Sequence, residues 1–111
     1  RQALDHLNKA IAIHPGYLEA YYMRGNVFFM FGQYEKAIED YRNCLALNAN
    51  FKDAYGNYAL SLREGARTIL SSKGDINVAI GYLEESLKLY PDEKETADLL
   101  AKARLAKTSG Q

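Results

Sequence analysis

The sequence has a single cysteine and only two prolines among its 111 residues. One cysteine cannot form an internal disulfide framework or a zinc site built from several cysteines. Two prolines are too few for a proline-rich linker. Valine and threonine are also scarce, with two and three copies, while alanine, leucine, lysine and glutamate are common. This balance favours helices over strands.

The sequence also lacks an excess of either charge and a long apolar run. Its 14 basic and 14 acidic side chains cancel, so it matches a polyphosphate backbone poorly and we expect no nucleic-acid binding. No apolar run approaches the ~20 residues of a membrane helix, so we expect no membrane span. Charged residues at 25% and apolar residues at 48% are ordinary values for one globular domain. The chain begins at Arg1 without methionine or a signal-peptide pattern, and we expect it to be part of a longer polypeptide.

What the sequence does contain is an internal repeat. Shifting the chain by 34 residues superposes a series of apolar and small residues, beginning with Ala3 on Ala37. From Ala37 onward the shift becomes 42, and Ala37 then falls on Ala79. Eight additional residues must therefore lie between Leu62 and Ala79. Self-similarity of this kind is the signature of a repeat architecture.

Each repeat is predicted to contain two helices. Apolar residues follow a 3.6-residue period over residues 18–31 and again over 34–47, with a break at residues 32–33. So short a connection forces the two helices into an antiparallel hairpin. The hairpin has an apolar face that only a neighbouring hairpin can cover. Hairpins of this kind therefore stack on one another and form a solenoid.

The middle unit, residues 18–51, carries small and aromatic residues at a fixed spacing: Tyr21, Gly25, Phe28, Gly32, Tyr34, Ala37 and Tyr41. This pattern resembles the tetratricopeptide repeat family. The resemblance implies an all-α fold, an α–α superhelix of six antiparallel helices in a single domain. Within residues 1–111 it implies four parts. Residues 1–17 form the second helix of a partial repeat and residues 18–51 form a full repeat. Residues 52–92 form a repeat with an eight-residue insertion, and residues 93–108 form a C-terminal capping helix.

The insertion, residues 66–73, fits the repeat in one of two ways. Either the preceding helix breaks near Gly65 and a short separate turn follows, or the helix runs on and its pairing shifts. Ala66, Ile69 and Leu70 continue the apolar spacing of the helix. We therefore expect a longer helix, to about Ser71, with a distortion near Gly65.

The last helix is predicted to begin with a capping box and to cover the end of the repeats. Asp92 would accept hydrogen bonds from the first-turn amides, with Glu95 three residues later. Charged residues would form the polar outer face that a terminal repeat needs. The inward stripe is predicted to consist of Ala97, Leu100, Ala101, Arg104 and Leu105.

The sequence offers no constellation of residues for catalysis or metal binding. His6 and His14 are the only histidines and Cys44 lies a repeat away, so we expect no metal site. Cys44 occupies a small-residue position and is interpreted as packing. Adjacent acidic pairs such as Glu39-Asp40 point about 100° apart on a helix, so they are interpreted as solvated faces. We therefore expect a protein that is not an enzyme, with no catalytic residues, cofactor or metal.

The resemblance instead implies a function in binding. In the family the first helix of each hairpin lines a concave groove, and ligand peptides lie across it. We expect Asn26 and Asn57, about 10 Å apart, each to bridge one peptide unit of an extended ligand. For Phe29 and Met30 the alternative is packing under the neighbouring helix. The candidate groove residues are Tyr22, Asn26, Phe29, Met30, Asn57, Leu60 and Arg63, and further groove-facing positions are Glu19, Asp53, Gly56 and Glu64.

One subfamily grips the C-terminal carboxylate of heat-shock chaperones with basic residues and two asparagines. Asn26 and Asn57 match the asparagines, but Tyr22 stands where the first basic residue would be. Glu95 and Leu99 occupy the positions of a further basic pair. Without these cations a buried carboxylate would be poorly compensated, so we do not expect this ligand.

The preferred hypothesis is a non-catalytic protein–protein interaction module that binds a peptide segment of a partner protein. The alternative is self-association into a homo-oligomer. The first helix lacks its hairpin partner, and a second chain could cover its apolar stripe, which consists of Ala3, Leu7, Ala10 and Ile11. A third hypothesis, a non-catalytic arm of an enzyme, depends on the rest of the polypeptide.

Overall fold

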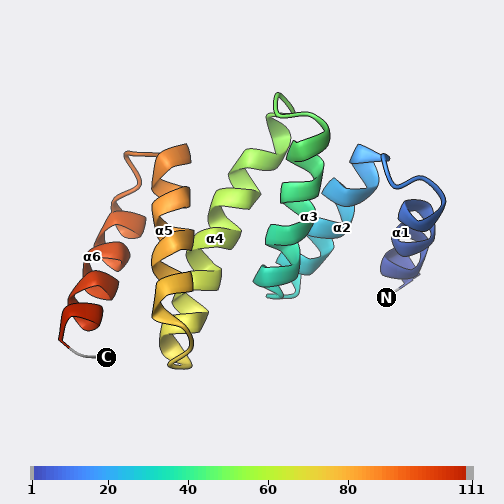
Figure 1. Ribbon diagram of the computed structural model, residues 1–111. Helices are drawn as coiled ribbons and strands as arrows, with labels where there is room; N and C mark the ends of the chain where they lie inside the picture. The colour runs from blue at the N-terminus through green and yellow to red at the C-terminus, as the bar shows by residue number, and fades with distance from the viewer. Residues whose placement is uncertain (1, 110–111) are drawn as a thin grey trace. The chain divides into compact units, whose positions relative to one another are not determined.

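The computed structural model describes residues 2–109 of the chain. These residues form no strand and six helices: α1 Gln2–Ile13, α2 Leu18–Met30, α3 Tyr34–Leu47, α4 Asp53–Ser71, α5 Ile76–Leu89 and α6 Lys94–Thr108 (Figure 1). The predicted all-α fold of six helices is confirmed, whereas the division into repeats remains an interpretation. Residues 1, 110 and 111 of the predicted domain lie outside the described residues. The chain forms two compact units: unit 1 ends at Ser61 and unit 2 begins at Leu62, both within α4.

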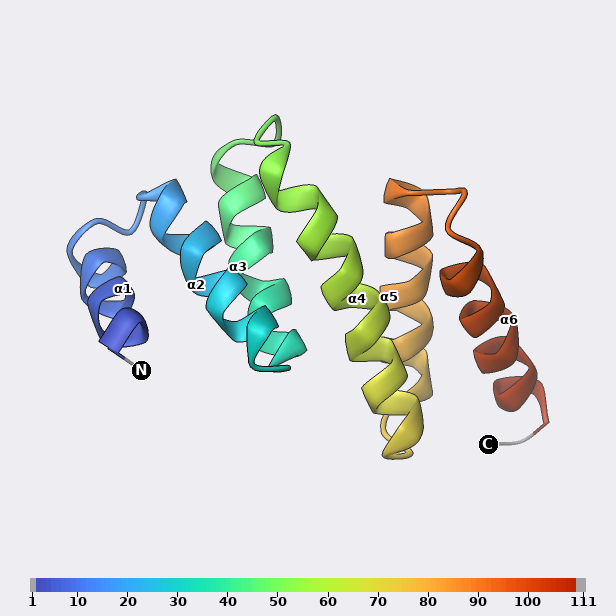
Figure 2. The same ribbon diagram turned by 180° about the vertical axis from the view of Figure 1, so that it is seen from behind.

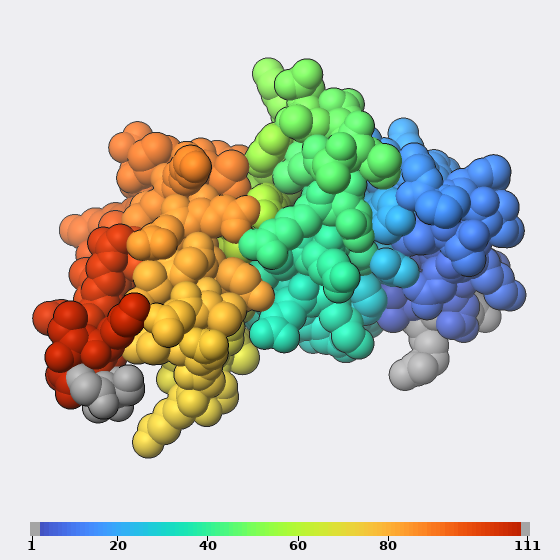
Figure 3. All heavy atoms as spheres, in the orientation of Figure 1, coloured from blue at the N-terminus to red at the C-terminus, as the bar shows by residue number. Residues whose placement is uncertain are grey.

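Unit 1 is built on a hairpin of α2 and α3. The two helices lie side by side and antiparallel in both ribbon views (Figures 1 and 2), and α1 packs on α2. Seen from the α3 side, the atoms of α3 cover most of α2 (Figure 3). The fully buried face of α3 includes Ala37, Ile38, Tyr41 and Cys44, each at most 1% exposed. Their spacing of i, i+1, i+4 and i+7 is the inward face that the helical period predicts.

A buried ion pair between Arg24 and Asp40 connects α2 and α3. Arg24 donates to both carboxylate oxygens of Asp40, from Nε at 2.8 Å and from a terminal nitrogen at 2.7 Å. Its other terminal nitrogen donates to Asn8 Oδ1 of α1 at 2.8 Å. Asp40 is 1% exposed, so the interpretation of Glu39-Asp40 as a solvated pair is wrong for Asp40. The carboxylate faces inward because Arg24 neutralises it and satisfies its oxygens.

The turn between α2 and α3 depends on Gly32. Its φ of +75° lies in the left-handed region, which glycine adopts without steric cost. The Gln33 amide donates to the Phe28 carbonyl at 2.9 Å, and the Gly32 amide donates to the Phe29 carbonyl at 3.0 Å. This bond pair is the Schellman motif that ends many helices.

α4 ends in the same motif, but a lysine takes the left-handed position. The Gly74 amide donates to the Ile69 carbonyl at 2.8 Å, and the Lys73 amide donates to the Leu70 carbonyl at 3.3 Å. Lys73 has a φ of +59°. Aligning the repeats places Gly74, rather than Lys73, opposite Gly32. The sequence therefore does not predict this strained residue.

Replacing Lys73 with glycine is expected to stabilise the protein by about 0.5–1 kcal/mol. The left-handed conformation costs an ordinary residue about 1–2 kcal/mol, and the greater freedom of glycine in the unfolded chain offsets part of the gain. Thermal unfolding followed by circular dichroism should show a rise of roughly 2–5 °C. The reverse exchange, Gly32→Lys, should lower the melting temperature. A lower melting temperature for Lys73→Gly would contradict the strain at this turn.

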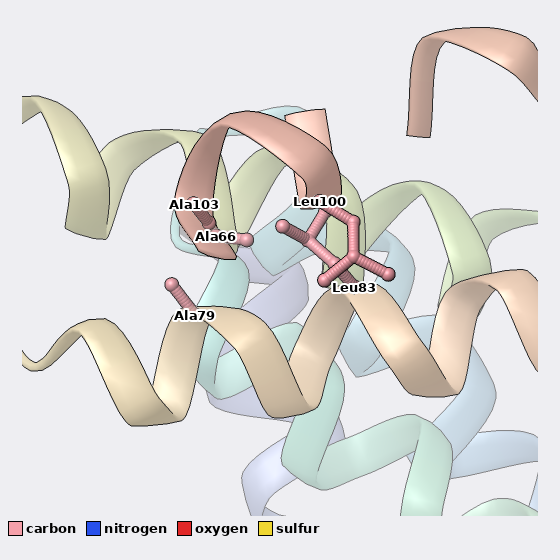
Figure 4. Packing of buried hydrophobic residues seen from close by; sticks show 5 residues of the cluster. All are labelled: Ala66, Ala79, Leu83, Leu100 and Ala103. Atoms are coloured by element: carbon pink, nitrogen blue, oxygen red, sulfur yellow. The ribbon is translucent and has the colours of Figure 1, made fainter. Parts of the chain in front are cut away.

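The insertion extends α4 and supplies part of the core of unit 2. α4 reaches Ser71, as predicted, but it is a single unbroken helix through Gly65, where the sequence analysis predicts a distortion. Ile69 and Leu70 pack against the buried cluster of unit 2. Side chains of α4, α5 and α6 converge in that cluster, which consists of Ala66, Ala79, Leu83, Leu100 and Ala103 (Figure 4).

The predicted capping box of α6 is wrong. The N-cap residue is Glu93, and its side chain makes no capping hydrogen bond. Asp92 therefore lies one residue too early to cap the helix. Glu95 instead accepts a hydrogen bond from Arg67 of α4. An ion pair between two helices has taken the place of the local cap.

The inward face of α6 is also rotated from the predicted stripe. Its fully buried residues are Thr96, Leu100 and Ala103, and Leu105 is 70% exposed. The other outward members of the predicted stripe are Ala97, Ala101 and Arg104. Alanine is small enough to fit either face, so the alanines do not distinguish between the two orientations. Only Leu100 belongs to both the predicted and the observed face.

Candidate functional site

The candidate residues of unit 1 surround a hydrogen-bonded triad from three helices. The Tyr41 hydroxyl donates to Asn26 Oδ1 at 2.5 Å, and Asn57 Nδ2 donates to the same oxygen at 3.2 Å. Tyr41 is fully buried, and this burial is the main reason why the pKa of its phenol is raised above the usual value. The hydroxyl therefore keeps its proton at neutral pH and acts as a donor.

The triad brings the side chains of the two asparagines together. Their amides are in contact because they extend toward each other from α2 and α4. Asn26 Oδ1 accepts two hydrogen bonds, which fills its acceptor capacity. The Nδ2 group of Asn26 is then the part of this side chain that suits a ligand carbonyl. The two asparagines form one polar centre, and the prediction that each of them bridges one peptide unit stays a prediction.

Tyr22 belongs to the aromatic packing beside this centre. Its ring meets Phe51 edge-on with a centroid distance of 5.1 Å and is tilted against Tyr41 at 6.5 Å. The side chain is half-buried. Tyr22 thus stabilises the hairpin and offers only part of its ring to a ligand.

Large apolar side chains are exposed on the same helices. Met30 is 81% exposed and Leu60 is 36% exposed, so packing under a neighbouring helix is excluded for Met30 within unit 1. Phe29 is half-buried and meets the Tyr34 ring at a centroid distance of 5.9 Å. The structure adds Met23, which is 52% exposed, to the candidates from the sequence. Its place seven residues before Met30, on the same helical face, is the sequence signal that identifies it.

Arg63 lies in unit 2, where carboxylates surround its guanidinium. It contacts Glu64 at 3.0 Å, Glu93 at 3.5 Å and Glu95 at 3.6 Å, and its side chain is 15% exposed. Arg67 pairs with Glu64 at 3.2 Å and also with Glu95. These contacts argue against the predicted role of Arg63 in ligand binding.

The same ion pairs stabilise the charged form of Glu64. Burial favours a higher pKa for this carboxyl, but hydrogen bonds from Arg63 and Arg67 outweigh burial and hold its pKa below the usual range. A lowered pKa stabilises the folded state above the pKa of the unfolded chain. That contribution is lost as the pH falls through the folded-state pKa.

Cys44 and the histidines belong to no metal-binding cluster in the part of the chain that the structure describes. Within residues 2–109, no group of three histidine, cysteine or carboxylate side chains is placed to hold a metal ion. Cys44 is fully buried, and this burial raises the pKa of its thiol to about 11. The thiol is therefore protonated at neutral pH and is a poor nucleophile.

None of the helices in residues 2–109 combines the length and the apolar composition needed to cross a bilayer.

Comparison with known proteins supports the resemblance found in the sequence. The pattern of the tetratricopeptide repeat family matches residues 18–51. A TPR repeat-containing protein of Rhizobium etli is 32% identical over 102 residues, which are 89% of this chain and 46% of the relative. The chain thus spans about half the length of the curated relative that it matches.

Two solved structures share the fold. The first TPR of Spaghetti (RPAP3), bound to the HSP90 peptide SRMEEVD, is 22% identical with a TM-score of 0.53, covering 95% of this chain and 77% of that one. The N-terminal domain of stress-induced protein-1 (STI-1) from C. elegans is 16% identical with a TM-score of 0.58, covering 89% and 76%. At these identities the likeness concerns the fold alone.

Proposed function

Because the chain belongs to the tetratricopeptide repeat family, we propose that unit 1 binds a peptide segment of a partner protein on the face formed by α2 and the first part of α4. Members of this family are generally non-catalytic interaction modules. Binding would rest on shape and hydrogen bonding and needs no chemical step. This asparagine face comprises Glu19, Tyr22, Met23, Asn26, Phe29, Met30, Asp53, Gly56, Asn57 and Leu60.

The observation that carries the proposal is the exposure of Met30 beside the asparagine centre. Met30 is 81% exposed and lies one helical turn after Asn26. An extended peptide needs polar partners for its backbone and apolar contacts for alternate side chains, and this face offers both. Methionine suits the second task because its flexible thioether adapts to different partners. The Spaghetti structure supports the proposal, since a peptide is bound to the same fold there.

The proposal is tested by selecting peptides from a random 12-residue display library and measuring their affinities for variants. Met30→Glu should weaken the binding of a selected peptide at least tenfold, because a carboxylate would replace the apolar contact. The matched control is Leu105→Glu on α6, a 70% exposed leucine that belongs to unit 2 and is not part of the asparagine face. Both variants should keep the helicity of the unchanged protein. Equal affinities for the two variants would place the binding site elsewhere.

Self-association through α1 remains the second candidate. The stripe residues Leu7, Ala10 and Ile11 are half-buried, since α1 packs on α2. The stripe therefore has a partial cover within the chain, which weakens the argument for a dimer. Ile13, at 70% exposure, is the large apolar residue of α1 that remains open. Sedimentation over a wide concentration range tests this candidate, and Ile13→Glu should abolish any dimer formed through α1.

A further inference from the structure

The charges on the asparagine face are all of one sign. α2 presents Glu19 and α4 presents Asp53, each exposed and in the first turn of its helix. Helical geometry places Glu19 within about 20° of Asn26 and Asp53 within about 40° of Asn57, around their respective axes. Because the two asparagines touch, the two carboxylates lie on adjoining faces.

The carboxylates also lie at the same end of the face. α2 and the first part of α4 run in the same direction, opposite to α3 (Figures 1 and 2). Glu19 and Asp53 therefore stand at one end, the asparagines follow, and Met30 and Leu60 lie farther along their helices. The face offers an anionic end, a polar centre and an apolar end, in that order.

The residues that define the asparagine face, all of them described by the structure, include no cation that could neutralise Glu19 and Asp53. The guanidinium of Arg24 is held by Asp40 and Asn8. Lys52 is exposed and directly precedes α4, and it is not one of the residues of the face. The charged side chains of the face itself are therefore the carboxylates of Glu19 and Asp53, and an acidic ligand would meet both of them.

The cations of α4 and the pocket between α4 and α6 in unit 2 lie beside carboxylates. Arg63 and Arg67 are paired with glutamates. The pocket between α4 and α6 mixes both signs of charge, since its lining consists of Arg67, Lys94, Glu95, Asp98, Leu99 and Lys102. A ligand carboxylate there would have to compete with carboxylates of the protein itself.

From these observations we infer that the asparagine face selects peptide segments that carry a basic side chain and, several residues away, an apolar one. This inference rests on the proposed function and specifies its ligand class. The basic side chain pairs with Glu19 and Asp53, the peptide backbone meets the asparagines, and the apolar side chain contacts Met30 and Leu60. An acidic peptide of the SRMEEVD kind, as bound to Spaghetti, is disfavoured by the same charges.

The test is a parallel library selection on two proteins. Random 12-residue peptides are selected on the unchanged chain and on the double variant Glu19→Lys/Asp53→Lys. The unchanged chain should enrich lysine and arginine together with methionine, leucine or phenylalanine, and the double variant should enrich aspartate and glutamate. A selected basic peptide should bind at least fivefold more weakly to the milder Glu19→Gln/Asp53→Asn variant, and 0.5 M salt should reduce this difference. Glu35→Lys on α3 is the matched control, since this glutamate is also exposed and in a first helical turn.

The outcomes separate this inference from the proposed function. Selected peptides that lose affinity with Met30→Glu but are acidic or show no charge preference would overturn the inference and leave the peptide-binding function standing. A dissociation constant below about 100 μM for SRMEEVD would also overturn the inference. Selection of no peptide at all would overturn the proposed function, and the inference with it. Circular dichroism of each variant verifies that the loss of binding does not come from unfolding.

Discussion

Replacing Arg24 with methionine is expected to lower the free energy of unfolding by about 3–5 kcal/mol. The carboxylate of Asp40 is 1% exposed and receives two hydrogen bonds from Arg24. Methionine keeps most of the apolar stem but removes the charge, so a buried carboxylate loses its compensating partner. The hydrogen bond with Asp40 is also the main reason why the pKa of Arg24 is raised. Chemical denaturation followed by circular dichroism measures the loss.

The double variant Arg24→Met/Asp40→Leu is the control for this prediction. Two apolar residues in place of a buried ion pair leave no uncompensated charge, and such exchanges are often neutral or stabilising. The double variant should therefore be more stable than Arg24→Met alone. If Arg24→Met unfolds at the same denaturant concentration as the unchanged protein, Asp40 is not a buried, charged partner of Arg24.

This ion pair shows how far the sequence determines the fold. The helical period places Arg24 on the inward face of α2, where its long stem substitutes for an apolar residue. It cannot show that Asp40 is the partner, because the two residues are 16 positions apart and the sequence presents Asp40 as one half of an acidic pair. Periodicity identifies the face of a helix, whereas a partner across a hairpin depends on the way the two helices are rotated against each other.

The same limit explains what the sequence does not predict at the candidate site and in α4 and α6. The helical period gives the face on which each asparagine lies, but their contact depends on the distance between α2 and α4. Lys73 takes the left-handed position because the motif that ends α4 places it there, although a glycine stands next to it. In α6 the alanines carry too little volume to fix the inward face. The approximate extents of the helices and the hairpin were predictable because they depend on local signals. The contact between the asparagines and the inward face of α6 were not predictable, because they depend on packing between helices.

Gly25→Ala is expected to destabilise unit 1, although alanine favours helices more than glycine does. A Cβ atom at position 25 would lie 2.9 Å from Cε1, 3.1 Å from Cδ1 and 3.2 Å from Cζ of Tyr41. The ring is held in its position, because its hydroxyl is bound to Asn26 at 2.5 Å and it packs against the rings of Tyr22 and Tyr58, with centroids 6.5 and 6.3 Å away. Overpacking of this kind costs about 1–3 kcal/mol.

Gly56→Ala is the matched control, since Gly56 is also helical, lies in the same unit and leaves open space around a Cβ atom, which would meet nothing within 4 Å. There the exchange should stabilise the helix by up to about 1 kcal/mol. The difference between the two variants removes the propensity contribution common to both and leaves the steric cost at Gly25. That difference, measured by chemical denaturation, should be about 1–3 kcal/mol. Equal stabilities would contradict the close packing of α2 and α3 through Gly25 and Tyr41. They would also contradict the fixed position of Tyr41 in the asparagine triad.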